Sequence, residues 1–428
     1  MSDYKKTKIG DRDLTPETLM MSYGYDPRLS QGAVKPPVFL TSTFTFEKAE
    51  DGEEFFNVMS GRKPGPEGQE RGGLIYSRFN HPNVEIVEDR LALLEEAETA
   101  VAFSSGMGAI SAVLFKTLRP GDVILHSTPL YGGTETLIRG MMPDFGIVPR
   151  SFKATSSYDE ILAAMRAAAK DGKLAMVFIE TPSNPTNDLV DFEAVIKAID
   201  VIEVETGHRP LSVCDNTMMG PVFQQAIPHG LDIALYSLTK YIGGHSDLVA
   251  GAICGARKVV EPIRRVRGAM GLNLDPHTSW MISRSLETLS IRMQRGGESA
   301  EKVARWLADN PYKKAKVLHL SLMDDAHTKA VFERQCKGAG STFAFVLDAS
   351  RKDMFALINA LQIFKSAVSL GGSESLVCHP ASTTHSGVPA ADRDASGVTD
   401  GLVRLSIGLE HPEDLIADLD HAFKTVFG

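Results

Sequence analysis

A single lysine, Lys240, stands in the segment "YSLTKYIGGHSD", where two hydroxyl side chains come just before it and a Gly-Gly turn follows. The hydroxyls belong to Ser237 and Thr239. A lysine amine can bond covalently to an aldehyde, and hydroxyl groups are good partners for a phosphate. Taken alone, the segment also fits a surface lysine beside a loop, so the chemistry depends on what other residues join it.

A glycine-rich turn offers a second phosphate ligand. In "AFSSGMGA" a predicted strand passes into a predicted helix through Gly106 and Met107. The first N–H groups of a helix have no partner inside it and carry partial positive charge, which suits an anion. A turn of this kind more often only reverses the chain, so we treat phosphate binding here as a hypothesis.

Two further strand ends carry polar side chains. "FIETPSNPT" ends a predicted strand with Glu180 and Asn184, and "SVCDNT" ends another with Asp215. Ligands of open parallel sheets bind at the carboxyl ends of the strands. Asp215 by itself more often forms a turn or begins a helix than takes part in catalysis.

Together these residues suit pyridoxal 5'-phosphate. The cofactor needs a lysine for its aldehyde, a carboxylate to keep its ring nitrogen protonated, and hydroxyl and amide groups for its phosphate. Tyr131, in "PLYGGT", is a candidate to stack on the ring, although a lone tyrosine is usually ordinary packing. The combination is much more specific than any one residue in it.

The elements that would position these residues alternate between helix and strand. From about residue 84 the chain shows helical periodicity and short apolar runs in turn, and the runs are continuously apolar, as in a parallel sheet covered by helices on both faces. We therefore predict an α/β fold. Strands are expected in "TAVAFSSG", "DVILHS", "LAMVFIET", "LSVCDNT", "IALYSLT" and "GAICG".

The chain has three predicted parts. Residues 1–80 are irregular and suggest an extended N-terminal arm, with an exposed loop at 60–73. Residues 81–290 form the large cofactor-binding domain, and residues 291–428 form a smaller α+β domain. The stretch "SWMISRSLETLSIRMQRGGESAEKVARWLADN" fits one long helix or two helices in series.

Composition excludes several classes of protein. The 428 residues carry a formal net charge of −9 and no long basic run, so we expect no nucleic-acid partner. No run of eighteen apolar residues and no signal peptide is visible, which predicts a cytoplasmic protein without a membrane partner. Four scattered cysteines suggest neither a disulfide framework nor a metal site, because the spacing of Cys378, His379 and His385 matches no zinc pattern.

The chain resembles the pyridoxal-phosphate-dependent enzymes of cysteine and methionine metabolism, the trans-sulfuration family, and its motifs are most similar to those of methionine γ-lyases and cystathionine γ-synthases. The resemblance covers nearly the whole chain. It rests on "YSRFNHPN", "SSGMGA", "LYGGT", "ETPSNPT", "CDNT", "SLTKYIGGHSD", "AVSLGGSESL", "HPASTTH" and "GLVRLSIGLE", in that order. It implies the fold of aspartate aminotransferase, called fold type I.

The resemblance also implies residue roles. Lys240 would bond to the cofactor and act as the base, and Tyr131 would stack on the ring and move a proton to the leaving group. Arg404 and Ser369 would bind the substrate. The remaining cofactor-binding residues would be Tyr76, Arg78, Gly106, Met107, Asn184, Asp215, Ser237 and Thr239, with Tyr76 and Arg78 reaching a neighbouring subunit's cofactor. That sharing implies an obligate dimer and a homotetramer of two dimers.

Two activities remain open for the amino acid substrate. The first is γ-elimination from methionine, homocysteine or cystathionine, giving 2-oxobutyrate, ammonia and a thiol. The second is γ-replacement on O-acetyl- or O-succinylhomoserine with cysteine or sulfide. Val368 resembles the aliphatic residue of methionine γ-lyases and sulfhydrylases, whereas Gly133 departs from the cysteine that methionine γ-lyases carry after "LYG". A third reading, a non-catalytic regulatory or binding protein on the same fold, is disfavoured, because such a protein would need none of Lys240, Asp215 and Arg404 together.

Overall fold

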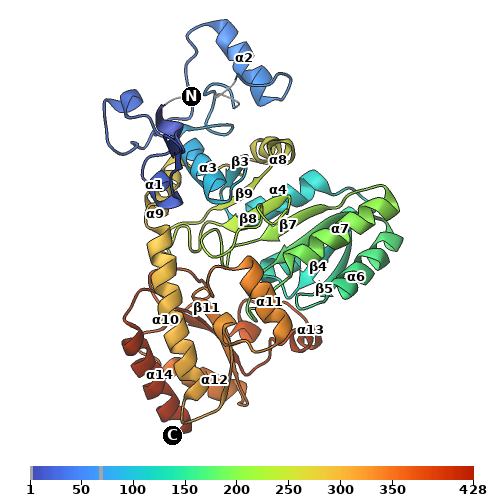
Figure 1. Ribbon diagram of the computed structural model, residues 1–428, viewed down its shortest axis with the longest axis vertical. Helices are drawn as coiled ribbons and strands as arrows, with labels where there is room; N and C mark the ends of the chain where they lie inside the picture. Colours follow the sequence, from blue (N-terminus) through green and yellow to red (C-terminus); the bar gives the residue numbers. More distant parts are fainter. Residues whose placement is uncertain (1–2, 67–70) are drawn as a thin grey trace. The chain divides into compact units, whose positions relative to one another are not determined.

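The computed structural model describes residues 3–66 and 71–428, and the chain divides into two compact units (Figure 1). Unit 1 comprises Met1–Lys116, Leu235–Gly243 and Leu248–Thr288. Unit 2 comprises Thr117–Ala234, Gly244–Asp247 and Leu289–Gly428. The boundaries expected after residues 80 and 290 stay a prediction. Residues 67–70 of the loop predicted at 60–73 lie outside the described residues.

The larger sheet has seven strands in the order β3-β9-β8-β7-β6-β4-β5. Strands β4, β5, β6 and β7 pair in parallel, and β3 pairs with β9 antiparallel. The α/β prediction is therefore confirmed, with one antiparallel pair in a mostly parallel sheet. The strands span Thr99–Phe103 (β3), Asp122–Thr128 (β4), Val148–Lys153 (β5), Lys173–Glu180 (β6), Leu211–Asp215 (β7), Ile233–Ser237 (β8) and Gly251–Gly255 (β9).

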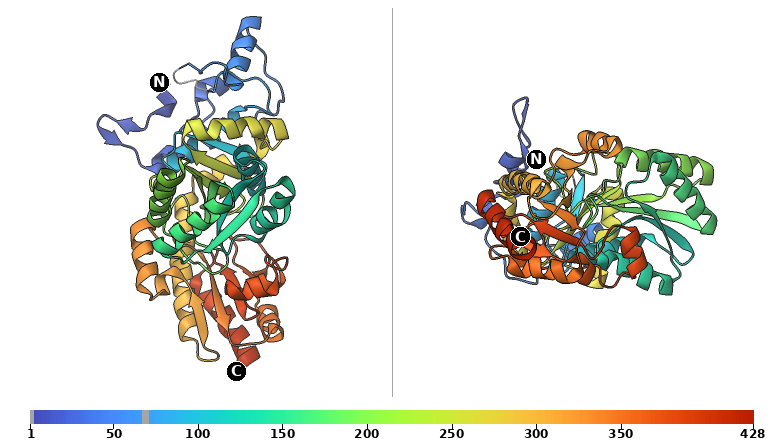
Figure 2. Two further views of the ribbon diagram at one scale, coloured as in Figure 1. Left: turned by 90° about the vertical axis from the view of Figure 1, so that its right-hand side faces the viewer. Right: turned by 90° about the horizontal axis from the view of Figure 1, so that it is seen from below.

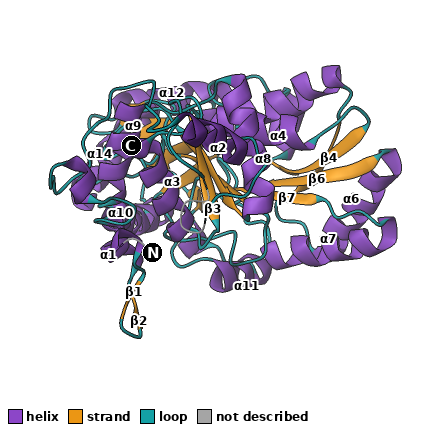
Figure 3. Cartoon of the chain, turned by 90° about the horizontal axis from the view of Figure 1, so that it is seen from above, coloured by secondary structure: helices purple, strands orange, loops and turns teal. Residues whose placement is uncertain are grey.

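Unit 1 contains more regular structure near the N-terminus than the predicted arm. A β1–β2 hairpin projects as a narrow ribbon (Figure 3), and an eleven-residue helix, α2, occupies part of the segment expected to be irregular. The elements are β1 (Lys8–Ile9), β2 (Arg12–Asp13), α1 (Pro16–Met20), α2 (Ala49–Met59), α3 (Pro82–Leu94), α4 (Gly106–Thr117), α8 (Arg257–Met270) and α9 (Pro276–Leu286).

The first half of unit 2 places helices against its parallel strands. Helices α6 (Tyr158–Asp171) and α7 (Phe192–Thr206) lie side by side along β4, β6 and β7 (Figure 3). Each begins where a side chain accepts a backbone N–H: Ser157 caps α6 and Asp191 caps α7. The segment after Tyr131 is divided into α5 (Gly132–Glu135), a π-helical turn (Thr136–Met141) and a 3₁₀ turn (Met142–Phe145).

The second half of unit 2 has a five-stranded sheet of order β10-β11-β14-β13-β12. The orange and red helices of this part, which include α10, α12 and α14, lie beside the sheet (Figure 2). Side chains of these three helices share its apolar core. The elements are α10 (Leu289–Asp309), β10 (Ala315–Leu318), α11 (Ala326–Gln335), β11 (Thr342–Leu347), α12 (Arg351–Ala360), β12 (Lys365–Ser366), β13 (Leu376–Cys378), α13 (Ala390–Ala395), β14 (Leu402–Ser406) and α14 (Pro412–Phe427). Within the described ranges, no helix combines the length and apolar character needed to span a bilayer.

Candidate active site

The predicted phosphate ligands of unit 1 meet at one place. Gly106 begins α4, and Ser237 ends β8. A Cβ on Gly106 would lie 3.0 Å from Cβ of Ser237 and 3.2 Å from its Oγ, so only glycine allows this approach without movement. Met107 follows in the first turn of α4, and Ser105 Oγ accepts the N–H of Gly108 at 2.9 Å. The structure therefore brings "SSGMGA" and "YSLTKY" together.

Lys240 lies in the turn that follows β8 and is half-buried. Its backbone N–H donates to the carbonyl of Ser237 at 3.2 Å, which closes the turn. Thr239 is held by Ala250: its Oγ1 donates to that carbonyl at 3.2 Å and accepts that N–H at 3.1 Å. The turn carrying the lysine is thus fixed to the segment entering β9.

Tyr76 and Arg78 lie near the end of the predicted arm, a few residues before α3. Nη1 of Arg78 donates to the carbonyl of Gly268 at 2.6 Å, and its guanidinium lies 4.3 Å from the centre of the Phe79 ring. Tyr76 is 40% exposed although aromatic. The contact of these two residues with a neighbouring subunit stays a prediction.

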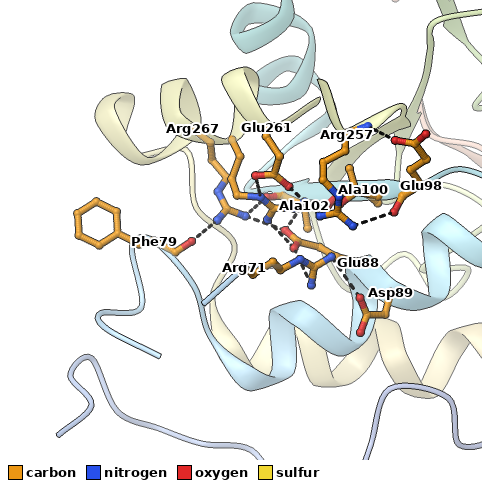
Figure 4. Close-up of polar contacts among 12 residues, drawn as sticks. Arg71, Phe79, Glu88, Asp89, Glu98, Ala100, Ala102, Arg257, Glu261 and Arg267 are labelled. Carbon is orange, nitrogen blue, oxygen red and sulfur yellow. Dashed lines mark hydrogen bonds and ion pairs between the residues drawn. The ribbon is translucent and has the colours of Figure 1, made fainter. Parts of the chain in front are cut away.

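A buried ion cluster supports both the strand before "SSGMGA" and the segment carrying Arg78. Glu88 of α3 binds Arg267 Nη1 at 2.9 Å and Arg264 Nη1 at 2.6 Å, both from α8. Arg267 also donates to the carbonyls of Ala102, in β3, and Phe79 (Figure 4). Burial opposes ionisation of Glu88, yet the three arginines Arg264, Arg71 and Arg267 lower its pKa to about 2.

Asp215 is the last residue of β7 in unit 2 and is buried. Its Oδ1 accepts the hydroxyl of Thr217 at 2.6 Å and the N–H of the same residue at 3.1 Å. Burial raises the pKa of Asp215 in spite of these two hydrogen bonds. A buried carboxylate of this kind is stabilised by a cation, and a protonated ring nitrogen is one.

The predicted substrate arginine, Arg404, lies in β14 and is only 2% exposed. Its Nη1 donates to Oδ1 of Asn184 at 2.9 Å. Its Nη2 donates to the carbonyls of Val368 and Ser369 at 3.1 and 3.0 Å. The structure therefore brings Asn184, Ser369 and Arg404 together, from segments far apart in the sequence.

Tyr131 precedes α5, and its side chain is 41% exposed, unlike most aromatic side chains of unit 2. Its N–H donates to Oε2 of Glu180 at 2.7 Å. Glu180 also accepts the N–H of Asn184. Glu180 was visible in the sequence as a strand-end carboxyl, but no role was predicted for it. Its partners are backbone N–H groups, which no motif identifies.

These donor sets fit pyridoxal 5'-phosphate. Unit 1 supplies a lysine, hydroxyls and N–H groups in the first turn of α4, with Gly106 allowing a close approach to Ser237 at the turn. Unit 2 supplies a buried carboxylate in Asp215, an amide in Asn184 and the exposed ring of Tyr131. These are the groups that an aldehyde, a phosphate and a protonated aromatic ring require.

In the described part of the chain, no group of three or more histidine, cysteine, aspartate or glutamate side chains is placed to hold a metal ion. Cys378 is buried, and burial raises the pKa of its thiol. Burial also lowers the pKa of His385 to about 4, and the positive charge of Arg404 acts in the same direction. His385 is therefore neutral at physiological pH.

Comparison with known proteins identifies the family. The model of the Cys/Met metabolism PLP-dependent enzymes matches residues 17–424. An L-methionine γ-lyase of Pseudomonas deceptionensis is 37% identical over 96% of this chain and 97% of its own length. An L-methionine γ-lyase of Fusobacterium nucleatum subsp. polymorphum is 36% identical over 99% of both chains.

Solved structures agree with this assignment. The cystathionine γ-synthase of Xanthomonas oryzae pv. oryzae, in complex with aminoacrylate and cysteine, superposes with a TM-score of 0.85 at 32% identity, covering 97% of this chain and 99% of that one. The cystathionine γ-lyase of Lactobacillus plantarum, complexed with L-serine, gives 0.84 at 29% identity, covering 96% and 99%. The predicted fold type I is confirmed. This chain belongs to the family of pyridoxal-phosphate-dependent enzymes of cysteine and methionine metabolism.

Proposed function

We propose that this enzyme carries out γ-elimination on a sulfur amino acid: methionine, homocysteine or cystathionine. The products are 2-oxobutyrate, ammonia and a thiol, and one water is consumed. The observation that carries the proposal is the similarity, over nearly the full length, to several proteins named L-methionine γ-lyase, at 34–37% identity. The aliphatic side chain of Val368, which is exposed beside the segment held by Arg404, supports a short apolar γ substituent.

Each cofactor ligand has its own role in this proposal. Lys240 would bond to the aldehyde, and Asp215 would keep a proton on the ring nitrogen. Asn184 would pair with the ring hydroxyl, and Tyr131 would stack on the ring. The hydroxyls of Ser237 and Thr239, the N–H groups of Gly106 and Met107, and Tyr76 and Arg78 of a neighbouring subunit would bind the phosphate.

Arg404 binds the substrate carboxylate. A planar guanidinium offers several N–H groups in a fixed plane and pairs with a carboxylate through two hydrogen bonds. The carbonyls of Val368 and Ser369 already hold Nη2 of Arg404, so the plane is set before the substrate arrives. Ser369 orients the substrate amine beside it. Pre-ordering of this kind reduces the entropy lost on binding.

Proton transfer is divided between two side chains. When bound, pyridoxal phosphate supplies an electron sink that stabilises negative charge at the α-carbon of the substrate. Once the substrate amine has replaced it, the freed amine of Lys240 would remove the α proton, return that proton to the cofactor-bound substrate and then remove a β proton, since a positioned base accelerates each step. The hydroxyl of Tyr131 delivers a proton to the departing sulfur. The exposed ring of Tyr131 is free to meet a ligand in this way.

The alternative is γ-replacement on an activated homoserine ester with cysteine or sulfide. It is favoured by the structural likeness to cystathionine γ-synthases and by Gly133, which departs from the methionine γ-lyase pattern. Both activities need the same cofactor ligands. They differ in whether water or a thiol consumes the intermediate.

Product analysis separates the two. Purified enzyme is given L-methionine, L-homocysteine or L-cystathionine, and in parallel O-acetyl- or O-succinylhomoserine with and without cysteine or sulfide. 2-Oxobutyrate, thiols and new thioethers are quantified, and Lys240→Ala serves as the inactive control. We expect equal amounts of 2-oxobutyrate and methanethiol from methionine. Thioether formation from an ester with little oxo acid from any substrate would refute the lyase proposal.

We also propose a cytoplasmic homotetramer of two obligate dimers. The described part of the arm exposes large apolar side chains, which a partner subunit would cover. These are Ile9, Leu29, Val34 and Leu40. The four cysteines are free thiols, as in a reducing compartment. Light scattering of the holoenzyme tests the assembly, and a monomer with full activity would refute the shared site.

A further inference from the structure

The carboxyl of Glu180 joins two loops that carry proposed cofactor ligands. Glu180 is the last residue of β6 and is 3% exposed. Its Oε2 accepts the N–H of Tyr131 at 2.7 Å, and its Oε1 accepts the N–H of Asn184 at 3.2 Å. One side chain therefore satisfies one backbone donor in each loop.

Other contacts also hold the loop of Asn184, since Nδ2 of Asn187 donates to the carbonyls of Leu318 and Thr342, but Glu180 contacts both loops through one side chain. The N–H of Tyr131 comes just before the short helix α5, and the side chain of Tyr131 remains exposed. Asn184 turns its Oδ1 toward Arg404, which donates to it at 2.9 Å. The chain of contacts from Tyr131 through Glu180 and Asn184 to Arg404 thus links the proposed ring-stacking residue with the proposed substrate arginine.

Glu180 is also the register partner of Asp215, on the neighbouring parallel strand β7. Side chains opposite each other on adjacent strands lie on the same face of the sheet, so the two carboxyls are close together in a buried place. Burial, followed by the charge of Asp215, raises the pKa of Glu180 well above its usual range, and Glu135 of α5 adds to the effect. Ionising both carboxyls would place two negative charges close together away from water, which is unfavourable, so one of them holds a proton.

We propose that Glu180 is a positioning residue of the cofactor site, which fixes the backbone of Tyr131 and Asn184 and carries the proton that leaves Asp215 ionised. The ionised Asp215 is the form that pairs with a protonated ring nitrogen. The inference rests on the cofactor assignment and is independent of which sulfur amino acid is consumed. Glu180 itself is not one of the cofactor ligands that the motifs imply.

Cofactor affinity tests this without any substrate. Cofactor-free wild type, Glu180→Gln, Glu180→Ala and the surface control Glu193→Gln are titrated with pyridoxal phosphate, and binding is followed by visible absorbance. Gln keeps the volume but replaces one acceptor oxygen with a donor that faces an N–H. We expect the dissociation constant to rise about tenfold or more for both Glu180 variants, as for a buried N–H that is left without its acceptor, and to change less than about twofold for Glu193→Gln.

A spectroscopic readout distinguishes positioning from simple loss of stability. The pH dependence of the visible cofactor band is measured for each holoenzyme, because a changed proton distribution at Asp215 shifts its midpoint. We expect a shifted midpoint in Glu180→Gln and an unchanged one in Glu193→Gln. A folded Glu180→Gln with wild-type affinity and midpoint would overturn the proposal. If Glu180→Gln does not fold, Glu180→Asp, which is one methylene too short to reach both N–H groups, replaces it under the same criteria.

The positioning role of Glu180 and the proposed lyase activity can be refuted independently of each other. If wild type eliminates no thiol from any sulfur amino acid, the lyase proposal is lost, but the affinity comparison still stands. If the Glu180 variants bind the cofactor like wild type, the positioning role is lost, and the product analysis is unaffected.

Discussion

Nη1 of Arg404 donates a hydrogen bond to Oδ1 of Asn184 across 2.9 Å, although the two residues are 220 positions apart in the sequence. The contact ties β14 of the five-stranded sheet to the loop that follows β6 of the seven-stranded sheet. It fixes the guanidinium from one side while the carbonyls of Val368 and Ser369 fix it from the other. A substrate carboxylate would therefore meet a guanidinium that is already oriented.

Replacing Arg404 by lysine tests that orientation. Lysine keeps the charge but offers a single ammonium group, which cannot make the two parallel bonds of a guanidinium. One lost charge-assisted hydrogen bond is worth about 1.5–3 kcal/mol, so we expect kcat/KM for a sulfur amino acid to fall about 10- to 100-fold, mainly through KM. The surface variant Arg351→Lys should leave both constants unchanged. An unaltered KM in Arg404→Lys would contradict the carboxylate-binding role.

Asp215→Asn removes the charge that is proposed to hold the ring nitrogen protonated. The amide keeps the size and the hydrogen bond from Thr217 but gives no ion pair. We expect the cofactor to bind at least about tenfold more weakly, measured by equilibrium titration of the cofactor-free protein. Asp348→Asn, at an exposed position, is the control. Equal affinity in Asp215→Asn and wild type would argue that this carboxylate does not face the cofactor.

Gly106→Ala probes the close approach at the predicted phosphate site. The added Cβ would meet Cβ of Ser237 at 3.0 Å, so the turn has to shift by a few tenths of an ångström. We expect weaker cofactor binding with little loss of folding cooperativity, measured by cofactor titration and thermal unfolding. Gly387→Ala, where a Cβ meets nothing within 4 Å, is the matched control. The same affinity in both variants would place the phosphate elsewhere.

The Glu88 cluster predicts a pH-dependent contribution to stability. The pKa of Glu88 is about 2 in the folded protein, against 4.5 for an unperturbed glutamate, so its stabilising effect is complete above pH 4.5 and is lost as the pH falls toward 2. Glu88→Gln leaves Arg264 and Arg267 without their buried carboxylate. We expect it to lower the free energy of unfolding by about 3–5 kcal/mol near neutral pH, measured by urea denaturation.

The difference in the free energy of unfolding between wild type and Glu88→Gln should shrink by roughly 2 kcal/mol between pH 6 and pH 3, because in this range Glu88 binds a proton in the unfolded wild type but stays mostly ionised in the folded one. Glu193→Gln, on the surface of α7, serves as the comparison. A difference that is the same at both pH values would mean that Glu88 is not ionised in the folded protein.

Elements with simple local signals could be predicted from the sequence. Strands β6 and β7 are continuous apolar runs that end in Glu180 and Asp215. Helices α9 and α10 correspond to the second of the two predicted possibilities, two helices in series. Helix α8 was not predicted, because its buried face includes Arg267 where an apolar residue would be expected, and Pro262 interrupts the pattern. That arginine is satisfied by Glu88, a partner that lies far away in the sequence.

The residues of the candidate site also divide into those with a local sequence signal and those whose role depends on distant contacts. Residues such as Lys240, Asp215 and Arg404 could be proposed because their chemistry is visible in a motif. The role proposed for Glu180 could not be, since it depends on which backbone N–H groups the fold turns toward it and on the register of β6 with β7. The contact of Arg404 with Asn184 likewise arises only from tertiary structure.

The most direct test of the account is the location of the bond between protein and cofactor. Holoenzyme is treated with borohydride, which reduces a lysine–cofactor bond to a stable one, and the digested protein is examined by mass spectrometry. We predict one phosphopyridoxyl group per chain, on Lys240, and none in Lys240→Ala treated in the same way. A label on another lysine, or an unlabelled but active wild type, would contradict the assignment of Lys240 as the cofactor lysine.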